Sequence, residues 1–477
     1  AGEFDTGADN VALTVTGDVD IATAGTLTTN ASAVTVGAIS ATGNGTYNAT
    51  THANGTIINS RHSSLGRGLS MGSVDRLVHN NGKIVFQGAS ALQGILINGT
   101  ATSSVGLYDV EINSTAAADC SLMGAVDIYR NLTIIEGELS THSTQNYALT
   151  VDGDCIVGNG SGSANTAILD GNASAISVGS LAIDTDGKYI ATSGTTTITS
   201  ERSDGYAINH DGNFVHSDGT VLITTPATTL LDLLATGNLY NLTINHGSCV
   251  ARMVAHTTID NDVTVTAGTL NTAYDVNVTV TGDVSVSGTF GLADESGAHS
   301  FGSLTIESGG THIATSGTTT ITKNTGTTLS GSTDRAMAVH GSGTFTHNKG
   351  IMKFTASSAD IRVLSQSTTN NPFYDVHFTN LGIWASDVNN FIVLNNLTLD
   401  DGLQFNGAGG YAVVKGIMFL NGGNFNHAGI CNNDNNNINF IDMSGGVLRL
   451  TDNSGTPAAI DITVGGIRKT GGSITTA

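Results

Sequence analysis

A short strand pattern that returns about every 21 residues constrains this chain more than any other feature. The pattern reads small polar, apolar, hydroxyl, apolar, and consecutive copies stand at 241–244 (NLTI), 262–265 (DVTV), 283–286 (DVSV) and 303–306 (SLTI). Apolar residues at alternate positions predict a half-buried strand with its apolar side chains on one face. A step of this size, with a short strand, a turn and a second short strand, fits one coil of a β-solenoid, whose stacked coils bury a common core.

A longer repeat of about 130 residues groups these coils. Residues 14–19 (TVTGDV) return at 150–155 and 279–284, and residues 190–199 (IATSGTTTIT) are repeated letter for letter at 313–322. Two shorter signatures recur in the same order, a His-x-x-Gly segment and a segment with a central tyrosine, at 79–82, 216–219 and 347–350, and at 107–110, 239–242 and 373–376. Four signatures in one order indicate about three and a half copies of one module.

The module spacing predicts the organisation of the chain. We expect a partial module at 1–75 and full modules at 76–212, 213–343 and 344–477, with the last one diverging toward the C-terminus.

The composition supports an all-β fold. Hydrophobic residues make up 39% of the chain and charged residues 12%, with 61 glycines and 3 prolines. Val, Ile and Leu among Thr, Ser, Asn and Gly are typical of pleated strands joined by tight turns. We therefore predict an all-β parallel β-solenoid of coils of about 21 residues. The alternative is a series of β-sandwich domains, which would usually bring Pro-containing linkers and a buried Trp, whereas this chain has a single tryptophan, Trp384.

The formal net charge of −22 argues against nucleic acid and anionic membranes as partners, because both require Lys and Arg. No apolar stretch approaches the ~20 residues that span a bilayer, so we expect no membrane insertion. Self-association is expected instead, since exposed solenoid ends and flat faces favour strand pairing. The start at Ala1 rather than at Met is that of a processed or partial chain.

The four cysteines, Cys120, Cys155, Cys249 and Cys431, are scattered and contain no CxxC pair. They predict neither a zinc site nor a dense disulfide framework. Buried small apolar side chains are the favoured interpretation. One or two disulfides stay open as the alternative, with no pairing that the spacing selects.

Candidate catalytic residues are dispersed. Asp400 and Asp401 form the tightest acidic pair, but adjacent residues of a strand point to opposite faces. The Gly-Asp pairs that begin at Gly17, Gly153 and Gly282 recur once per module, which indicates a structural turn.

The histidines give no catalytic constellation either. His79, His216 and His347 recur at module spacing, too far apart along the chain to share a metal ion, and His210-Asp211 has no nucleophile signature near it. We predict no catalytic, cofactor-binding or metal-binding residue, and no enzyme activity.

Asparagine-rich segments carry the remaining candidates. The tract 432–437 (NNDNNN) predicts an Asn-rich loop or an Asn ladder at a solenoid corner. A calcium site is the alternative, although the EF-hand and nonapeptide spacings are absent. Sequons at Asn98, Asn131, Asn241 and Asn396 are as frequent as chance produces in such a chain and do not indicate glycosylation.

Segments such as NLTI, TVTGDV, GSLTI and SGTTTIT resemble the repetitive β-helical proteins of bacteriophage virions and of prokaryotic cell surfaces. That class includes tail and capsid fibres, large adhesins and surface-layer-like proteins. The resemblance implies a structural or attachment role outside the cell, with surface glycans as candidate ligands. The leading hypothesis is a virion component, a tail or capsid fibre or a decoration protein. The alternatives are a secreted or surface-anchored adhesin, filament or surface-layer protein of a prokaryote, and a polysaccharide-active β-helix enzyme.

Overall fold

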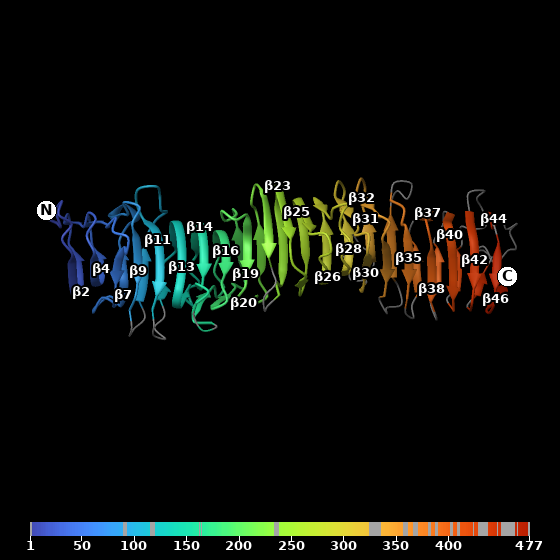
Figure 1. The fold of residues 1–477 in the computed structure, drawn as a ribbon, viewed down its shortest axis with the longest axis horizontal. Helices are drawn as coiled ribbons and strands as arrows, with labels where there is room; N and C mark the ends of the chain where they lie inside the picture. Colours follow the sequence, from blue (N-terminus) through green and yellow to red (C-terminus); the bar gives the residue numbers. More distant parts are fainter. Residues whose placement is uncertain are drawn as a thin grey trace. The chain divides into compact units, whose positions relative to one another are not determined.

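The computed structural model describes residues 2–88, 93–114, 120–161, 163, 165–232, 238–323, 335–355, 361–365, 371–379, 383–386, 390–400, 404–407, 411–422, 424–427, 437–445, 447–449, 463–464 and 466–475. Strands make up 57% of the structure, and parallel sheets form a β-solenoid (Figure 1). The predicted solenoid is therefore confirmed. Tandem β-sandwiches are excluded, because sandwich sheets pair their strands antiparallel whereas neighbouring strands here run parallel.

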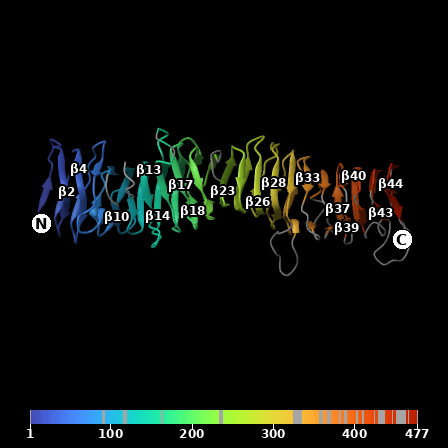
Figure 2. The ribbon, with the colours of Figure 1, turned by 90° about the horizontal axis from the view of Figure 1, so that it is seen from below.

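The chain divides into two compact units, Ala1–Asn241 and Leu242–Ala477. The division falls at the start of β23 (Asn241–Met253). Within each unit the strands of consecutive coils lie side by side in chain order (Figures 1 and 2).

The strands of unit 1 are β1 (Glu3–Asp5), β2 (Leu13–Ile21), β3 (Thr26–Thr28), β4 (Val34–Ala41), β5 (Thr46–Asn48), β6 (Thr56–Ile58), β7 (Arg67–Met71), β8 (Leu77–Val78), β9 (Lys83–Phe86), β10 (Gln93–Ile97), β11 (Leu107–Asn113), β12 (Cys120–Leu122), β13 (Val126–Ser140), β14 (Leu149–Val157), β15 (Ala167–Asp170), β16 (Ile176–Ile183), β17 (Gly187–Ile190), β18 (Thr195–Ile198), β19 (Tyr206–His210), β20 (Asn213–Val215), β21 (Thr220–Ile223) and β22 (Thr228–Asp232). A single 3₁₀ turn, η1 (Val74–Arg76), is the one helical element among the described residues of this unit.

The strands of unit 2 are β23 (Asn241–Met253), β24 (Thr257–Ile259), β25 (Val263–Thr272), β26 (Val278–Val286), β27 (Thr289–Phe290), β28 (His299–Ile306), β29 (Thr311–Ile313), β30 (Thr318–Ile321), β31 (Arg335–Val339), β32 (Thr344–Thr346), β33 (Ile351–Phe354), β34 (Ile361–Ser365), β35 (Asp375–Phe378), β36 (Ile383–Ser386), β37 (Asn390–Val393), β38 (Leu397–Asp400), β39 (Gln404–Gly407), β40 (Tyr411–Asn421), β41 (Asn424–His427), β42 (Asn437–Met443), β43 (Val447–Arg449), β44 (Thr463–Val464), β45 (Ile467–Lys469) and β46 (Ser473–Thr475). Throughout the part of the chain that the structure describes, no helix is long and apolar enough to cross a membrane.

Among the described residues, coils such as those of β2 with β3 and β4 with β5 contribute three strand segments rather than two. The first and second halves of β2 pair with the corresponding halves of β4, and β3 pairs with β5. β2 and β4 are thus single long strands that bend at a corner and serve two columns of the solenoid. The third column is built from short strands such as β3 and β5.

The predicted 21-residue step is a real register in unit 2. Leu242 pairs with Val263, Val263 with Val284, and Val284 with Leu304, so the four predicted strands are consecutive neighbours in one column. Their apolar side chains are completely buried. The step is not uniform, however, because Leu304 is followed in the same column by Met337. Longer connections between strands lengthen such coils without changing the column.

The recurring Gly-Asp pairs form the corners at which a long strand changes column. The parallel register shifts between Val15 and Asp18, and the same shift occurs at the equivalent residues of β14 and β26. A β-bulge of this kind bends the strand. A Cβ atom added to Gly37, Gly179 or Gly302 would collide with the backbone of Gly17, Gly153 or Gly282, respectively, so the corners stack glycine on glycine.

The His-x-x-Gly signatures are tight turns. In the segment 216–219, Ser217 and Asp218 have φ angles of 47° and 60°, and the N–H of Gly219 donates to the His216 carbonyl at 2.9 Å. Positive φ at both central residues is the geometry of a type I′ turn. The segments at His79 and His347 repeat this geometry.

The glycine that ends this turn lies directly against the neighbouring coil. A Cβ at Gly219 would fall well inside van der Waals contact with the Thr192 carbonyl oxygen. We therefore expect Gly219→Ala to lower the free energy of unfolding by ~1–3 kcal/mol, since backbone cannot yield as a side chain can. Gly194→Ala is the matched control, because its Cβ would meet its nearest neighbour, the Thr192 hydroxyl, at 3.3 Å. Equal unfolding midpoints in denaturant titrations of the two variants would contradict this packing.

The described cysteines are buried, as predicted. Cys155 and Cys249 carry free thiols, and burial raises their pKa to about 12 and about 11. The Cys120 thiol donates to the Gln93 carbonyl at 3.1 Å. Cys431 lies outside the described residues.

Candidate functional site

The recurring histidines and tyrosines of the sequence meet in space. The ring centroids are 4.7 Å apart for His79 and Tyr108, 5.2 Å for His216 and Tyr240, and 5.4 Å for His347 and Tyr374, and each pair is stacked. In every copy the histidine Nδ1 also accepts the N–H of the residue two positions on, at 2.8–2.9 Å. These histidines therefore make contacts within the solenoid: the ring stacks on a tyrosine, and Nδ1 accepts a hydrogen bond that stabilises the turn.

Around His79 the stack extends to a further coil. Tyr129 stacks on Tyr108 with centroids 6.0 Å apart, and the Arg130 guanidinium lies 5.4 Å from the Tyr108 centroid. Arg130 also pairs with Asp109 at 3.2 Å. The ring faces contact one another, so this surface consolidates neighbouring coils.

A ladder of Asn and Asp side chains runs along the corners, and sequence reasoning missed it. Asn131 Oδ1 accepts the N–H of Asp154, one coil on, at 2.9 Å, and Asp262 Oδ1 accepts the N–H of Asp283 at 2.7 Å. Asn396 Oδ1 likewise accepts the N–H of Ile417 at 3.0 Å. The small polar residue before each apolar-Thr-apolar strand is the signal that could have predicted it. Two sequon asparagines, Asn131 and Asn396, thus have a structural role.

The remaining predicted candidates do not assemble into one site. His210 is buried against Phe214, with centroids 5.8 Å apart. Asp400 pairs with His377 at 2.7 Å, while Asp401 lies outside the described residues. The tract 432–437 lies outside them too, except for Asn437, the first residue of β42. Within the described ranges, no group of three or more His, Cys, Asp or Glu side chains could hold a metal ion.

One surface groove does place two carboxylates on adjacent coils. The groove has a volume of about 440 Å³ and is lined by Asn98, Gly99, Thr100, Ala125, Val126, Asp127, Ala148, Thr150 and Asp152. Asp127 pairs in register with Thr150, and Asp152 shares the face of Thr150 because alternate strand residues point the same way. Burial raises the pKa of Asp127, and the Asp152 charge adds to this effect.

Glu295, His299 and His312 are titratable side chains that are buried in the interior of unit 2. Glu295 Oε1 accepts the Thr272 N–H at 2.6 Å, and burial raises the pKa of this carboxyl to about 7. His299 and His312 lie among Phe290 and Phe301, with centroid distances of 5.4–6.2 Å. Burial lowers the pKa of His299 to about 4. For His312, burial and then the charge of His299 lower the pKa to about 3.

The module repeat shows that His312 occupies the place of a tyrosine. It directly precedes the repeated segment 313–322, as Tyr189 precedes 190–199. The buried Tyr189 hydroxyl lies 2.7 Å from Thr196 Oγ1, whereas the equivalent Thr319 Oγ1 is buried without a hydrogen-bond partner. The identical repeat was thus a sequence signal for a substituted core position.

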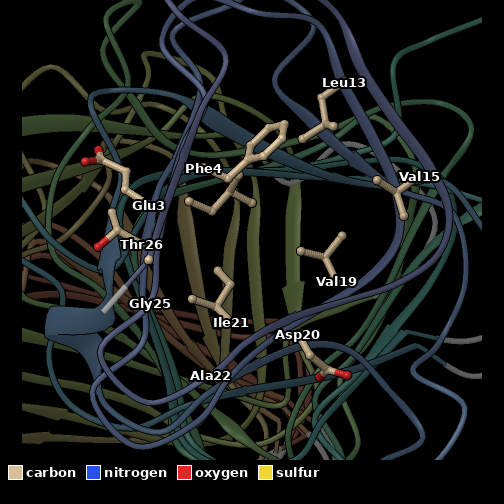
Figure 3. Close-up of a pocket in the computed structure, with 12 residues that line it drawn as sticks. Glu3, Phe4, Leu13, Val15, Val19, Asp20, Ile21, Ala22, Gly25 and Thr26 are labelled. Carbon is tan, nitrogen blue, oxygen red and sulfur yellow. The ribbon is translucent and has the colours of Figure 1, made fainter.

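The N-terminal face of unit 1 carries an open surface that is lined mainly by apolar residues. A cavity of about 410 Å³ is lined by Gly2, Glu3, Phe4, Leu13, Val15, Val19, Asp20, Ile21, Ala22, Gly25, Thr26 and Leu27. Figure 3 shows Phe4, Leu13, Val15, Val19 and Ile21 arranged around one open space. Phe4 is 56% exposed, whereas Leu27 and Tyr47, which follow it in the same column of strands, are buried.

Comparisons of this chain with protein-family models, with curated proteins and with solved structures find no match.

Proposed function

We propose that this chain is an extracellular structural or attachment protein, and that it serves in a virion as a tail or capsid fibre or as a decoration protein. One observation carries the proposal. The histidines, tyrosines and corner Asn and Asp residues that recur in the modules make contacts between coils, such as the His216–Tyr240 stack and the Asn131 ladder. Repeated chemistry that joins each coil to the next supports a mechanical role, because a stack of this kind gains stability from neighbour contacts.

The charge and the coil interior fit the same role. An acidic surface with a net charge of −22 keeps a large repetitive protein soluble and disfavours binding to nucleic acid. Stacked coils with buried Val, Ile and Leu columns form a stiff spacer whose outer faces present loops to a receptor or a surface glycan.

Immunogold electron microscopy of the source material, with antibody raised to this chain, tests the proposal. Gold on tailed or icosahedral particles is the expected result, and its position on the particle separates a fibre from a decoration protein. Gold on cell envelopes or extracellular filaments, with unlabelled particles, would overturn the virion role and support the alternative of a prokaryotic adhesin, filament or surface-layer protein.

A second function, cleavage of a polysaccharide, is favoured by the groove that holds Asp127 and Asp152. General acid catalysis requires a carboxyl group with a raised pKa, as burial gives Asp127, and Asp152 supplies a second carboxyl group in the same groove. Incubation with a panel of bacterial surface polysaccharides, followed by a reducing-end assay, tests it. Loss of product in Asp127→Asn, but not in a variant of an exposed acid elsewhere such as Asp204→Asn, would support the enzyme. If no polysaccharide of the panel gives a product, the enzyme function is contradicted and the structural role is the one proposal that stands.

A further inference from the structure

In two modules a buried tyrosine hydroxyl group meets a buried threonine of the next coil. The two side-chain oxygen atoms are 2.5 Å apart for Tyr47 and Thr56, and 2.7 Å apart for Tyr189 and Thr196. All four side chains are buried. The Tyr189 hydroxyl group also accepts a hydrogen bond from the Thr192 backbone. The phenolic oxygen is therefore the centre of a small hydrogen-bond network inside the solenoid.

The third copy of this network keeps the threonines and loses the tyrosine. Since the repeated segments are identical, the residues correspond one to one: His312 replaces Tyr189, and Thr315 and Thr319 stand for Thr192 and Thr196. An imidazole is shorter than a phenol and lacks its hydroxyl group. Thr319 Oγ1 is accordingly buried without a hydrogen-bond partner in the protein.

A second histidine enters the core at the same place. His299 pairs in register with Thr319, and both side chains are 1% exposed. The equivalent residues of the other two modules are aliphatic, Val34 and Ile176. Two imidazoles thus lie around one threonine hydroxyl group, where the other modules have one phenol and one aliphatic side chain.

The nitrogen atoms of the two imidazoles determine what can bind between them. One backbone carbonyl group lies next to each ring, that of Val276 beside His299 and that of Phe290 beside His312. A neutral imidazole carries one N–H and one lone pair, so a carbonyl group can engage only one nitrogen of each ring. The other nitrogen of each ring is an acceptor, and it is buried without a partner in the protein.

These groups match the hydrogen bonds of one water molecule. Water donates two hydrogen bonds and accepts two, and a buried water typically makes about three. The lone pairs of His299 and His312 can accept its two protons. The Thr319 hydroxyl group and the Thr315 N–H can donate to its oxygen. A single histidine would leave one proton of the water without an acceptor, which explains why two histidines occur together.

We propose that the interior of unit 2 holds one structural water molecule between His299, His312 and Thr319, at the place that the tyrosine hydroxyl group takes in the other two modules. The water connects the coil of the two histidines to the next coil through hydrogen bonds, as the phenol of Tyr189 does directly. This inference does not depend on the proposed function.

A metal ion is the competing ligand for a pair of histidines, and the surroundings disfavour it. Phe290 and Phe301 contact both imidazoles, with centroid distances of 5.4–6.2 Å. An ionic charge that is buried among apolar side chains, with neutral ligands alone, costs far more free energy than a neutral water molecule with its hydrogen bonds formed.

The variant Thr319→Val of the full chain tests the proposal by the sign of its effect. If the water is bound, the substitution removes one of its hydrogen-bond donors. We then expect the thermal unfolding midpoint of unit 2, followed by the fluorescence of Trp384, to fall by ~2–4 °C. If no water is bound, valine replaces an unsatisfied hydroxyl group by a methyl group of the same shape. An unchanged or raised midpoint would therefore overturn the proposal.

Two further variants make this test specific. Thr320→Val is the matched control on the outer, half-buried side of the same strand, and it should shift the midpoint by less than Thr319→Val does. His312→Tyr restores the phenol and displaces the water. In that variant Thr319 regains a direct partner, so adding Thr319→Val should lower the midpoint, which verifies that the reporter detects the loss of this hydroxyl group.

Crystal structures of the natural chain and of His312→Tyr give the direct readout. We expect one water molecule at ~2.7–3.2 Å from Thr319 Oγ1 in the natural chain, and the tyrosine hydroxyl group in its place in the variant. A direct hydrogen bond between Thr319 Oγ1 and either histidine would overturn the proposal. So would an anomalous scattering peak between the two imidazoles, because the ligand would then be a metal ion.

Discussion

The variant His299→Val/His312→Tyr is expected to lose far less stability in acid than the natural chain. Both substitutions introduce the residues that the partial module at 1–75 carries at the equivalent positions, Val34 and Tyr47. The folded state holds His312 with a pKa of about 3, against 6.5 when exposed, so the unfolded chain binds the proton more readily between these values. Stability is therefore complete above pH 6.5 and declines as the pH falls toward 3. At pH 4 the loss from His312 alone is about 3 kcal/mol.

Denaturant titrations at pH 7 and pH 4 measure this effect, with Trp384, the single tryptophan, as a fluorescent reporter in unit 2. In the natural chain the midpoint should fall between pH 7 and pH 4 by much more than in the variant. His246→Gln, at a half-buried position of the same unit, is the control and should behave as the natural chain does. The single variant His312→Phe shows whether an unexpected result comes from poor packing of the double variant. It removes the titrating group of His312 without the second substitution, so its acid loss should also be smaller than that of the natural chain. An acid loss unchanged in every variant would contradict the assignment.

Glu295→Gln is expected to stabilise unit 2 at pH 8 by about 3 kcal/mol and to have little effect near pH 4.5. Burial raises the pKa of the folded carboxyl to about 7 from 4.5, so the folded state holds the proton more tightly across this window. The natural chain therefore loses stability as the pH rises from 4.5 through 7. A neutral amide has nothing to ionise, and its oxygen can still accept the Thr272 N–H that Glu295 accepts at 2.6 Å.

The same titrations, run at pH 5, 6.5 and 8, test this prediction. The difference between Glu295→Gln and the natural chain should grow with pH and level off above 7. Glu307→Gln provides the control, because Glu307 lies in the neighbouring coil at a half-buried position. A constant difference at all three pH values would mean that the amide changes packing rather than removing a buried charge.

Stability falls in acid because of the two histidines and in base because of Glu295, and both effects have the same structural reason. A solenoid core is built by repetition, so a polar residue that occurs in one module only can leave buried polar atoms without a hydrogen-bond partner, such as Glu295 Oε2 and both ring nitrogens of His299 and His312. Thr319 shows this directly, since its hydroxyl has lost the phenol that Thr196 meets in the equivalent module. We infer that unit 2 contains both acid-sensitive groups, His299 and His312, and a base-sensitive group, Glu295, within neighbouring coils.

The architecture could be predicted from the sequence because it depends on local periodicity. Apolar residues alternate at 242–244 and at 263–265, so each strand needs one buried face. Because the two strands are 21 residues apart, stacking one coil on the next buries these faces most simply. The turn at His216 could be predicted as well, because the Gly at its end and the polar residues within it are short-range signals.

Pairings between coils could not be predicted in this way. The His216–Tyr240 stack joins residues 24 positions apart, and the Asn131–Asp154 hydrogen bond joins residues 23 positions apart. Their partners are chosen by the register of stacked coils, which varies with the length of each connection. The number of strand segments in a coil could not be predicted either. A long strand such as β14 bends at Gly153, but its buried and exposed side chains continue to alternate through the bend, so the sequence pattern does not reveal the corner.

The sequence by itself determined that this chain is an all-β solenoid with repeated modules, since hydrophobic periodicity and turn residues act over a few positions. Only the tertiary structure decided which polar residues are buried and which corners are stacked. These properties depend on what lies one coil away. The physical reason is that burial, pKa and steric contact are set by neighbours in space. The identical segments 190–199 and 313–322 therefore acquire different environments, as the hydroxyl groups of Thr196 and Thr319 show.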